Sequence, residues 1–154
     1  MHEWAVAKAV AATVRRAAKG KVRRVIVSVP LISFLDVDLI KEAYSSTVRG
    51  TPLEGSKLEV KVRDVKFKCL SCGLEFSSKD VKDQIEALKE EFGEDYPLHM
   101  FPSLAPALLK CPACGSHDLD ITGSEIRLEG IELDNGNGVT FVKVKGLMRD
   151  SLLK

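Results

Sequence analysis

The sequence predicts an α+β protein, in which a small, mostly antiparallel β-sheet is packed with two helices and a four-cysteine module is inserted. Three observations support this fold class. Ala-rich and amphipathic segments alternate with β-branched runs, all four cysteines fall into two Cys-x-x-Cys pairs, and 154 residues suffice for one ordinary domain with a small insertion. Two hydrophobic cores are therefore the most that we expect.

The first segment, residues 2–18, predicts an amphipathic helix. It is rich in Ala, contains no Gly or Pro, and places Lys8 and Arg15 on one face. The opposite face includes Trp4 and Val14, which share the helical period. We expect this face to be buried, with Trp4 as an anchor of the core.

The next two elements are a strand and a second helix. Residues 22–29 form a β-branched run that is typical of a buried strand. Residues 36–50 then offer Asp36 or Asp38 as the N-cap of a helix and Gly50 as its stop.

A half-exposed strand follows and runs towards the first cysteine. Over residues 56–69, the side chains of Leu58, Val60 and Val62 alternate with charged residues and are expected to point inward. The alternation predicts one continuous strand.

The remaining elements lie between and after the cysteine pairs. Residues 77–93 predict a capped helix that ends at a glycine. Residues 117–121 and 124–147 alternate as strands do, and "DNGNG" at 134–138 is a strong hairpin turn. We expect these last strands to rejoin the sheet that the first two strands begin.

Charge and hydropathy narrow the classes of function. With 23 Lys and Arg against 22 Asp and Glu, the formal net charge is +1, so no overall positive field attracts the chain to nucleic acid. No apolar run approaches the roughly 20 residues that a membrane helix needs, and the start lacks the pattern of a signal peptide. We expect a cytoplasmic protein, where paired cysteines favour a metal over disulfides.

The two cysteine pairs predict a zinc-ribbon-like module. They are "CLSCG", with Cys69 and Cys72, and "CPACGS", with Cys111 and Cys114; we call each loop a knuckle. Two knuckles supply four thiolates, the ligand set of a closed structural Zn(II) site without an open position for water. Iron in the same site and a thiol/disulfide redox pair are the alternatives.

The opening residues "MHEWAV" offer a second kind of metal site. The α-amine of Met1, the backbone nitrogen of His2 and the imidazole of His2 can close two adjacent chelate rings in nearly one plane. Square-planar nitrogen donors suit Ni(II) or Cu(II), and a cytosol that keeps copper as Cu(I) favours nickel. The fourth donor could be the backbone nitrogen of Glu3 or a side chain from elsewhere in the chain. The alternative is that His2 and Glu3 merely begin a helix, with Glu3 favourable near its positive end.

These features together resemble the HypA family of nickel metallochaperones for [NiFe]-hydrogenase. The resemblance rests on "MHEWA" at the start, "GTPLEG" before the strand into "CLSCG", and "CPACGS", and it covers nearly the whole chain. It implies that Met1, His2 and the backbone of Glu3 hold labile Ni(II), while the four cysteines hold structural zinc. It also implies no bond-making chemistry, so the chain is not expected to be an enzyme.

The long insert between the knuckles resembles the archaeal branch of the family. There a histidine before the second knuckle can complete the nickel square, and His99 in "PLHMFPS" occupies that position; a partly buried, purely structural histidine is the alternative. The implied domains are a nickel-binding α+β domain, residues 1–66 and 119–154, and a zinc-binding domain with an inserted helix, residues 67–118. In "SVPLISFLDV" (residues 28–37) the chain departs from the Gly-Glu-Leu segment usual in the family.

The resemblance also implies partners. The family passes nickel towards the hydrogenase large subunit together with a nucleotide-hydrolysing factor, HypB, and urease is a further recipient within the family. Homo-oligomer formation stays open. The competing interpretation is a zinc-ribbon interaction module or nucleic-acid-binding regulator without labile metal, which the near-zero net charge disfavours.

Overall fold

Residues 2–136 and 138–148 are described in the computed structural model, and they form two compact units. The first unit is built from the described residues of Met1–Val29, Leu35–Lys61 and Ile126–Lys154. The second unit contains Pro30–Phe34 and Val62–Glu125. The predicted division into a nickel-binding domain, residues 1–66 and 119–154, and a zinc-binding domain, residues 67–118, stays a prediction.

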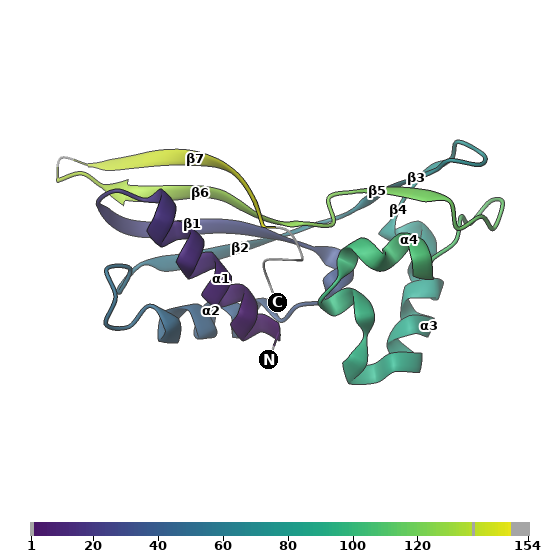
Figure 1. The fold of residues 1–154 in the computed structure, drawn as a ribbon, viewed down its shortest axis with the longest axis horizontal. Coiled ribbons are helices and arrows are strands. Elements are labelled where there is room, and N and C mark those ends of the chain that lie inside the picture. The colour runs from purple at the N-terminus through teal and green to yellow at the C-terminus, as the bar shows by residue number, and fades with distance from the viewer. Residues whose placement is uncertain (1, 137, 149–154) are drawn as a thin grey trace. The chain divides into compact units, whose positions relative to one another are not determined.

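The first unit is an α+β layer pair, which confirms the predicted fold class. Its four-stranded sheet has the order β2-β1-β6-β7, and β6 pairs antiparallel with both β1 and β7. Figure 1 shows both of its helices on the same face of this sheet. The elements are α1 (His2–Ala17), β1 (Lys21–Pro30), α2 (Val37–Thr47), β2 (Lys57–Arg63), β6 (Ile126–Asp134) and β7 (Val139–Met148).

Helix α1 forms where the Ala-rich segment predicts it, but the side chain of Trp4 is not a core anchor. The fully buried positions Val6, Val10 and Val14 define the inner face of the helix. Trp4 is 37% exposed. Since each residue turns the helix by about 100°, Trp4 lies at the edge of the face on which Glu3, Val10 and Val14 lie.

The start of α2 is fixed by two carboxylates. Asp36 is the N-cap, and its side chain accepts a hydrogen bond from the backbone N–H of Leu39 at 3.1 Å. The backbone N–H of Asp36 itself donates to the carboxylate of Glu3 at 2.9 Å. Because Glu3 is only 6% exposed, this bond ties the first turn of α1 to the first turn of α2 in a buried position.

Replacing Glu3 by Gln is expected to destabilise the protein by about 1–3 kcal/mol, because a charge-assisted hydrogen bond in a buried place becomes a neutral one. Urea unfolding monitored by circular dichroism measures this change. The matched control is Glu42→Gln, since Glu42 is an exposed acid on α2. Equal stability of the two variants would contradict a structural role for the Glu3 carboxylate.

The second unit contains a three-stranded antiparallel sheet and the long insert. The sheet order is β4-β3-β5, and the helices are mostly short. The elements are η1 (Leu31–Ser33), β3 (Lys66–Cys69), β4 (Glu75–Ser77), η2 (Ser78–Val81), α3 (Lys82–Phe92), η3 (Gly93–Asp95), η4 (Pro97–His99), η5 (Pro102–Leu104), α4 (Ala105–Leu108) and β5 (Leu119–Thr122). Its core is a single apolar cluster around Phe67, Leu98 and Leu109.

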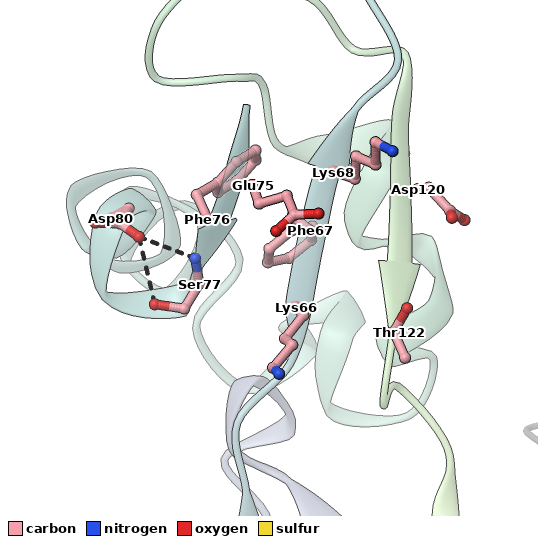
Figure 2. A pocket seen from close by; sticks show the side chains of 9 residues that line it. All are labelled: Lys66, Phe67, Lys68, Glu75, Phe76, Ser77, Asp80, Asp120 and Thr122. Atoms are coloured by element: carbon pink, nitrogen blue, oxygen red, sulfur yellow. Dashed lines mark hydrogen bonds between the residues drawn. The ribbon is translucent and has the colours of Figure 1, made fainter. Parts of the chain in front are cut away.

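The two faces of this small sheet differ in character. Phe67 and Phe76 face the core and stack with ring centroids 5.0 Å apart. Lys68 lies between its cross-strand partners Glu75 and Asp120 on the other face, as Figure 2 shows. The polar side chains keep this face solvated, while the opposite face of the sheet covers the apolar core of the unit.

Two strand predictions were wrong. The segment 56–69 is not one strand, because it breaks at Asp64 and Val65 into β2 and β3, which belong to different sheets. Val62, expected to point inward, is 52% exposed. Strand β5 was expected to rejoin the first sheet but pairs with β3, from Leu119 opposite Cys69 onward.

The helix predicted over 77–93 begins as a 3₁₀ turn. A capping box links Ser77 and Asp80, whose carboxylate accepts from the backbone N–H of Ser77 at 2.9 Å. Regular α-helix runs only from Lys82 to Phe92. Gly93, with φ 54°, ends it as predicted, since this left-handed conformation is open to glycine.

Candidate metal centre

Each knuckle is a tight turn that is closed by backbone hydrogen bonds and contains a glycine. The N–H of Gly73 donates to the carbonyl of Cys69 at 2.8 Å, and that of Gly115 donates to Cys111 at 2.9 Å. Both glycines have positive φ, 83° and 77°, which a side chain would strain. The tight turns direct the two sulfurs of each pair to the same side.

The four sulfurs meet at one point. Cys69 Sγ lies 3.5 Å from Cys114 Sγ, and Cys72 Sγ lies 3.6 Å from Cys111 Sγ. All four ligand atoms lie within 4.8 Å of one another. A tetrahedron of Zn–S bonds of about 2.3 Å separates its sulfurs by about 3.8 Å, whereas a disulfide needs about 2.05 Å. The arrangement therefore fits a tetrahedral metal ion.

Contacts between the two loops hold the knuckles against each other. Ser71 Oγ and Ser116 Oγ lie 2.9 Å apart, and the N–H of Leu70 donates to the carbonyl of Asp118 at 2.8 Å. One cysteine of each pair is buried and the other is exposed. A bound ion would be shielded by protein on one side, with two thiolates at the surface.

The thiols influence one another strongly. The backbone N–H of Cys72 lowers the pKa of the Cys69 thiol to about 6. The backbone N–H of Ser116 lowers the pKa of the Cys114 thiol, but the neighbouring thiols and burial together outweigh this effect and raise that pKa to about 12. Four adjacent thiolates repel one another, and a divalent cation at their centre removes this repulsion.

The two histidines of the second unit differ in surroundings. His117 is exposed beside the second knuckle, and its Nδ1 lies 2.8 Å from the carbonyl of Leu109. His99 is partly buried at the end of η4, with Nδ1 2.9 Å from the carbonyl of Ser33. A carbonyl at Nδ1 places the proton there and leaves the lone pair on Nε2, as in many metal-binding histidines. His99 is not part of the four-cysteine cluster.

The predicted nickel residues lie at the start of α1. Met1 falls outside the described residues, while His2 is the first residue of the helix and Glu3 the second. The first four N–H groups of an α-helix have no acceptor within the helix, so amide nitrogens here can bind a metal without loss of helical hydrogen bonds. The bond from Glu3 to Asp36 was missed at the sequence level, where an acid in a first helical turn was the only signal.

Comparisons with known proteins agree with these features. The family model described as "Hydrogenase/urease nickel incorporation, metallochaperone, hypA" matches residues 1–133. Hydrogenase maturation factor HypA from Ignicoccus hospitalis is 35% identical over 145 residues, which cover 89% of this chain and 99% of the relative. The protein of the same name from Pyrococcus furiosus is 37% identical over 139 residues, 87% of this chain and 96% of the relative.

A solved structure supports the fold. The solution structure of the Ni metallochaperone HypA from Helicobacter pylori aligns with a TM-score of 0.51 at 19% identity, over 86% of this chain and 97% of that one. Within the part of the chain that the structure describes, no helix has both the length and the apolar character needed to cross a membrane. The chain belongs to the HypA family of nickel metallochaperones, as its family match and its relatives show.

Proposed function

We propose that the chain binds labile Ni(II) at its N-terminus and delivers it during hydrogenase maturation, while the four cysteines hold structural Zn(II). The observation that carries the zinc assignment is the convergence of four sulfurs within 4.8 Å. Zinc supplies charge and a tetrahedral centre there, and the protein leaves no ligand position open for water. A bound ion would then fix the paired ends of β3 and β5 within the second unit.

The nickel assignment rests on the donor set at the start of the chain. With Met1 as the first residue, its amine, the backbone nitrogen and imidazole of His2, and the backbone nitrogen of Glu3 offer four nitrogens to a square-planar ion. The family match begins at residue 1, which supports a role for these residues. The buried Glu3 side chain fixes the first turn of the helix that carries them.

His99 is proposed as an alternative fourth donor through Nε2. The hydrogen bond between its Nδ1 and the Ser33 carbonyl supports this role, because it sets the required tautomer.

Delivery requires a recipient and a partner for release. We propose the hydrogenase large subunit as recipient, with urease as a second candidate, and a HypB-type nucleotide-hydrolysing factor as partner. The family description, which names hydrogenase and urease nickel incorporation, supports this proposal.

Elemental analysis with equilibrium dialysis tests the proposed function. Protein with the native start should hold one zinc per chain after dialysis against a weak chelator and should take up one nickel that the same chelator removes. A chain that retains zinc but takes up no nickel at micromolar concentration would contradict the proposal.

Replacing His99 by Ala is expected to lower nickel affinity about tenfold, less than the loss of an irreplaceable ligand, because the backbone nitrogen of Glu3 can take the fourth position instead. His117→Ala is the matched control, because His117 also has a carbonyl at Nδ1 and lies in the same unit. Isothermal titration calorimetry with Ni(II) measures the nickel affinity of both variants. Equal affinity of the two variants would exclude His99 as a ligand.

A further inference from the structure

An apolar cleft of about 270 Å³ lies within the second unit, between η1 and α3. Ile32 and Ile85, which are 0% and 4% exposed, form its floor. Leu31 and Phe34 line it with side chains that are 41% and 43% exposed. This volume holds one bulky side chain, since sites for drug-sized ligands span about 300–1,000 Å³.

The side chain of Phe34 is packed against neighbouring side chains although it is exposed. Its backbone has φ 51° and ψ 34°, a left-handed conformation that costs free energy in a residue other than glycine. Its ring packs edge-on against Tyr96, with centroids 5.8 Å apart, and Lys89 Nζ lies 3.9 Å from the ring centroid. An exposed aromatic ring that is already fixed loses little conformational entropy when a ligand covers it.

The segment that carries Phe34 is anchored to the core of the same unit. The hydroxyl of Tyr96 donates to the carbonyl of Ile32 at 2.9 Å, and the Ser33 carbonyl lies 2.9 Å from His99 Nδ1. This is the part of the chain where the sequence departs from the Gly-Glu-Leu segment expected for the family. The cleft is therefore a built feature of this chain instead of a gap between loose loops.

The rim of the cleft is positive. Three exposed lysines, Lys79, Lys82 and Lys89, line it, against one carboxylate, that of Glu86. The Glu86 carboxylate oxygen Oε1 lies 3.9 Å from Lys82 Nζ. This ion pair is exposed to solvent and therefore contributes little to stability. Because the chain as a whole carries only +1, this excess is local and favours an acidic ligand.

We propose that this cleft docks an acidic segment of a partner protein, which places one bulky apolar side chain against Phe34 and its carboxylates near the three lysines. An apolar anchor in a desolvated pocket with a charged rim is the usual arrangement of a small protein interface. The proposal goes beyond the nickel role and does not depend on it.

Two synthetic peptides of 12 residues test the proposal with the full-length, zinc-loaded chain. One carries four Glu around a central Leu-Phe pair, and the other has Gln in place of each Glu. In ¹⁵N-labelled protein, the acidic peptide should shift the amide resonances of residues 31–34 and 78–89 to saturation. The Gln peptide should bind at least about tenfold more weakly, because rim charges contribute steering and specificity.

Two variants separate the contribution of Phe34 to peptide binding from that of the lysines at the rim. Phe34→Asn removes the ring and tolerates the left-handed backbone, while the double variant Lys79→Glu, Lys82→Glu reverses charge without touching Phe34. Each should lower the affinity for the acidic peptide at least about tenfold. The control is Lys66→Glu, Lys68→Glu, on the polar face of β3 (Figure 2), which should bind unchanged.

Four results would overturn the proposal. These are equal binding of both peptides, shifts confined to other residues, an equal loss in the control variant, and cleft shifts that depend on protein concentration without peptide. The last would assign the cleft to a second copy of the chain. Unchanged spectra of the variants away from the cleft verify that they remain folded.

Discussion

One glycine added ahead of Met1 is expected to lower nickel affinity at least about 100-fold. The extension turns the primary amine into an amide and shifts the chelate rings, so the imidazole of His2 no longer completes the same set of donors. Loss of an outer partner alone costs about 10- to 100-fold in metal affinity, and loss of a ligand costs more. His2→Ala should have an effect of similar size, measured by competition with a chelator of known nickel affinity.

The same site should respond steeply to pH. Binding to the amine, imidazole and amides releases protons, at least one per ion throughout the range from pH 8 to pH 6. The affinity should therefore fall by at least about 100-fold as the pH drops over these two units. A weaker dependence would show that deprotonated amides take no part.

The control for the glycine extension and for His2→Ala is His117→Ala, which removes an exposed histidine distant in sequence from the N-terminus. It should bind nickel as the unaltered chain does. Glu3→Gln is equally informative, because it lowers stability but retains the backbone nitrogen of residue 3. If Glu3→Gln loses nickel while the glycine extension does not, the carboxylate and not the terminus holds the ion.

Cys114→Ser is expected to abolish stoichiometric zinc binding and to unfold the metal-bound end of the second unit. Apparent binding free energies for structural zinc reach about 10–16 kcal/mol in small peptides, which exceeds the stability of most domains. Strands β3 and β5 end at the knuckles, so they lose a fixed end when the ion leaves. Zinc content and hydrogen exchange by mass spectrometry measure the two effects.

The matched control is Ser71→Ala, which lies between the two cysteines of the first knuckle, removes the hydroxyl contact to Ser116 and retains the backbone N–H. It should retain zinc and lose less than about 1.5 kcal/mol. Removal of zinc from the unaltered chain by a strong chelator should reproduce the exchange pattern of Cys114→Ser within Val62–Glu125 and leave α1 and α2 protected. Global unfolding in either case would contradict a local role for the metal.

The local elements could be predicted because their causes lie within short stretches. Helix α1 follows from Ala content and period, the cap of α2 from Asp36, and the end of α3 from Gly93. The four cysteines could be grouped because each pair is spaced to bind one ion. Their convergence confirms the cluster, although the nickel residues stay a prediction because Met1 lies outside the described part of the chain.

Other features depend on contacts between residues far apart in sequence, which no local pattern encodes. The break at Asp64 sends β2 and β3 into different sheets, and β5 joins β3 because the second knuckle must meet the first. The alternating residues 56–69 look alike on both sides of that break, so periodicity could not locate it.

The sequence by itself determined α1, α2 and most of α3, most strands and the grouping of the four cysteines, since propensity, capping and chelate spacing act over a few residues. The tertiary structure decided that Trp4 is exposed, that Glu3 anchors α2, and that Phe34 lines a cleft with α3. Glu3 and Phe34 contact residues more than thirty positions away in the sequence, and the side chain of Trp4 contacts solvent. The burial of these three side chains therefore depends on how the elements pack against one another.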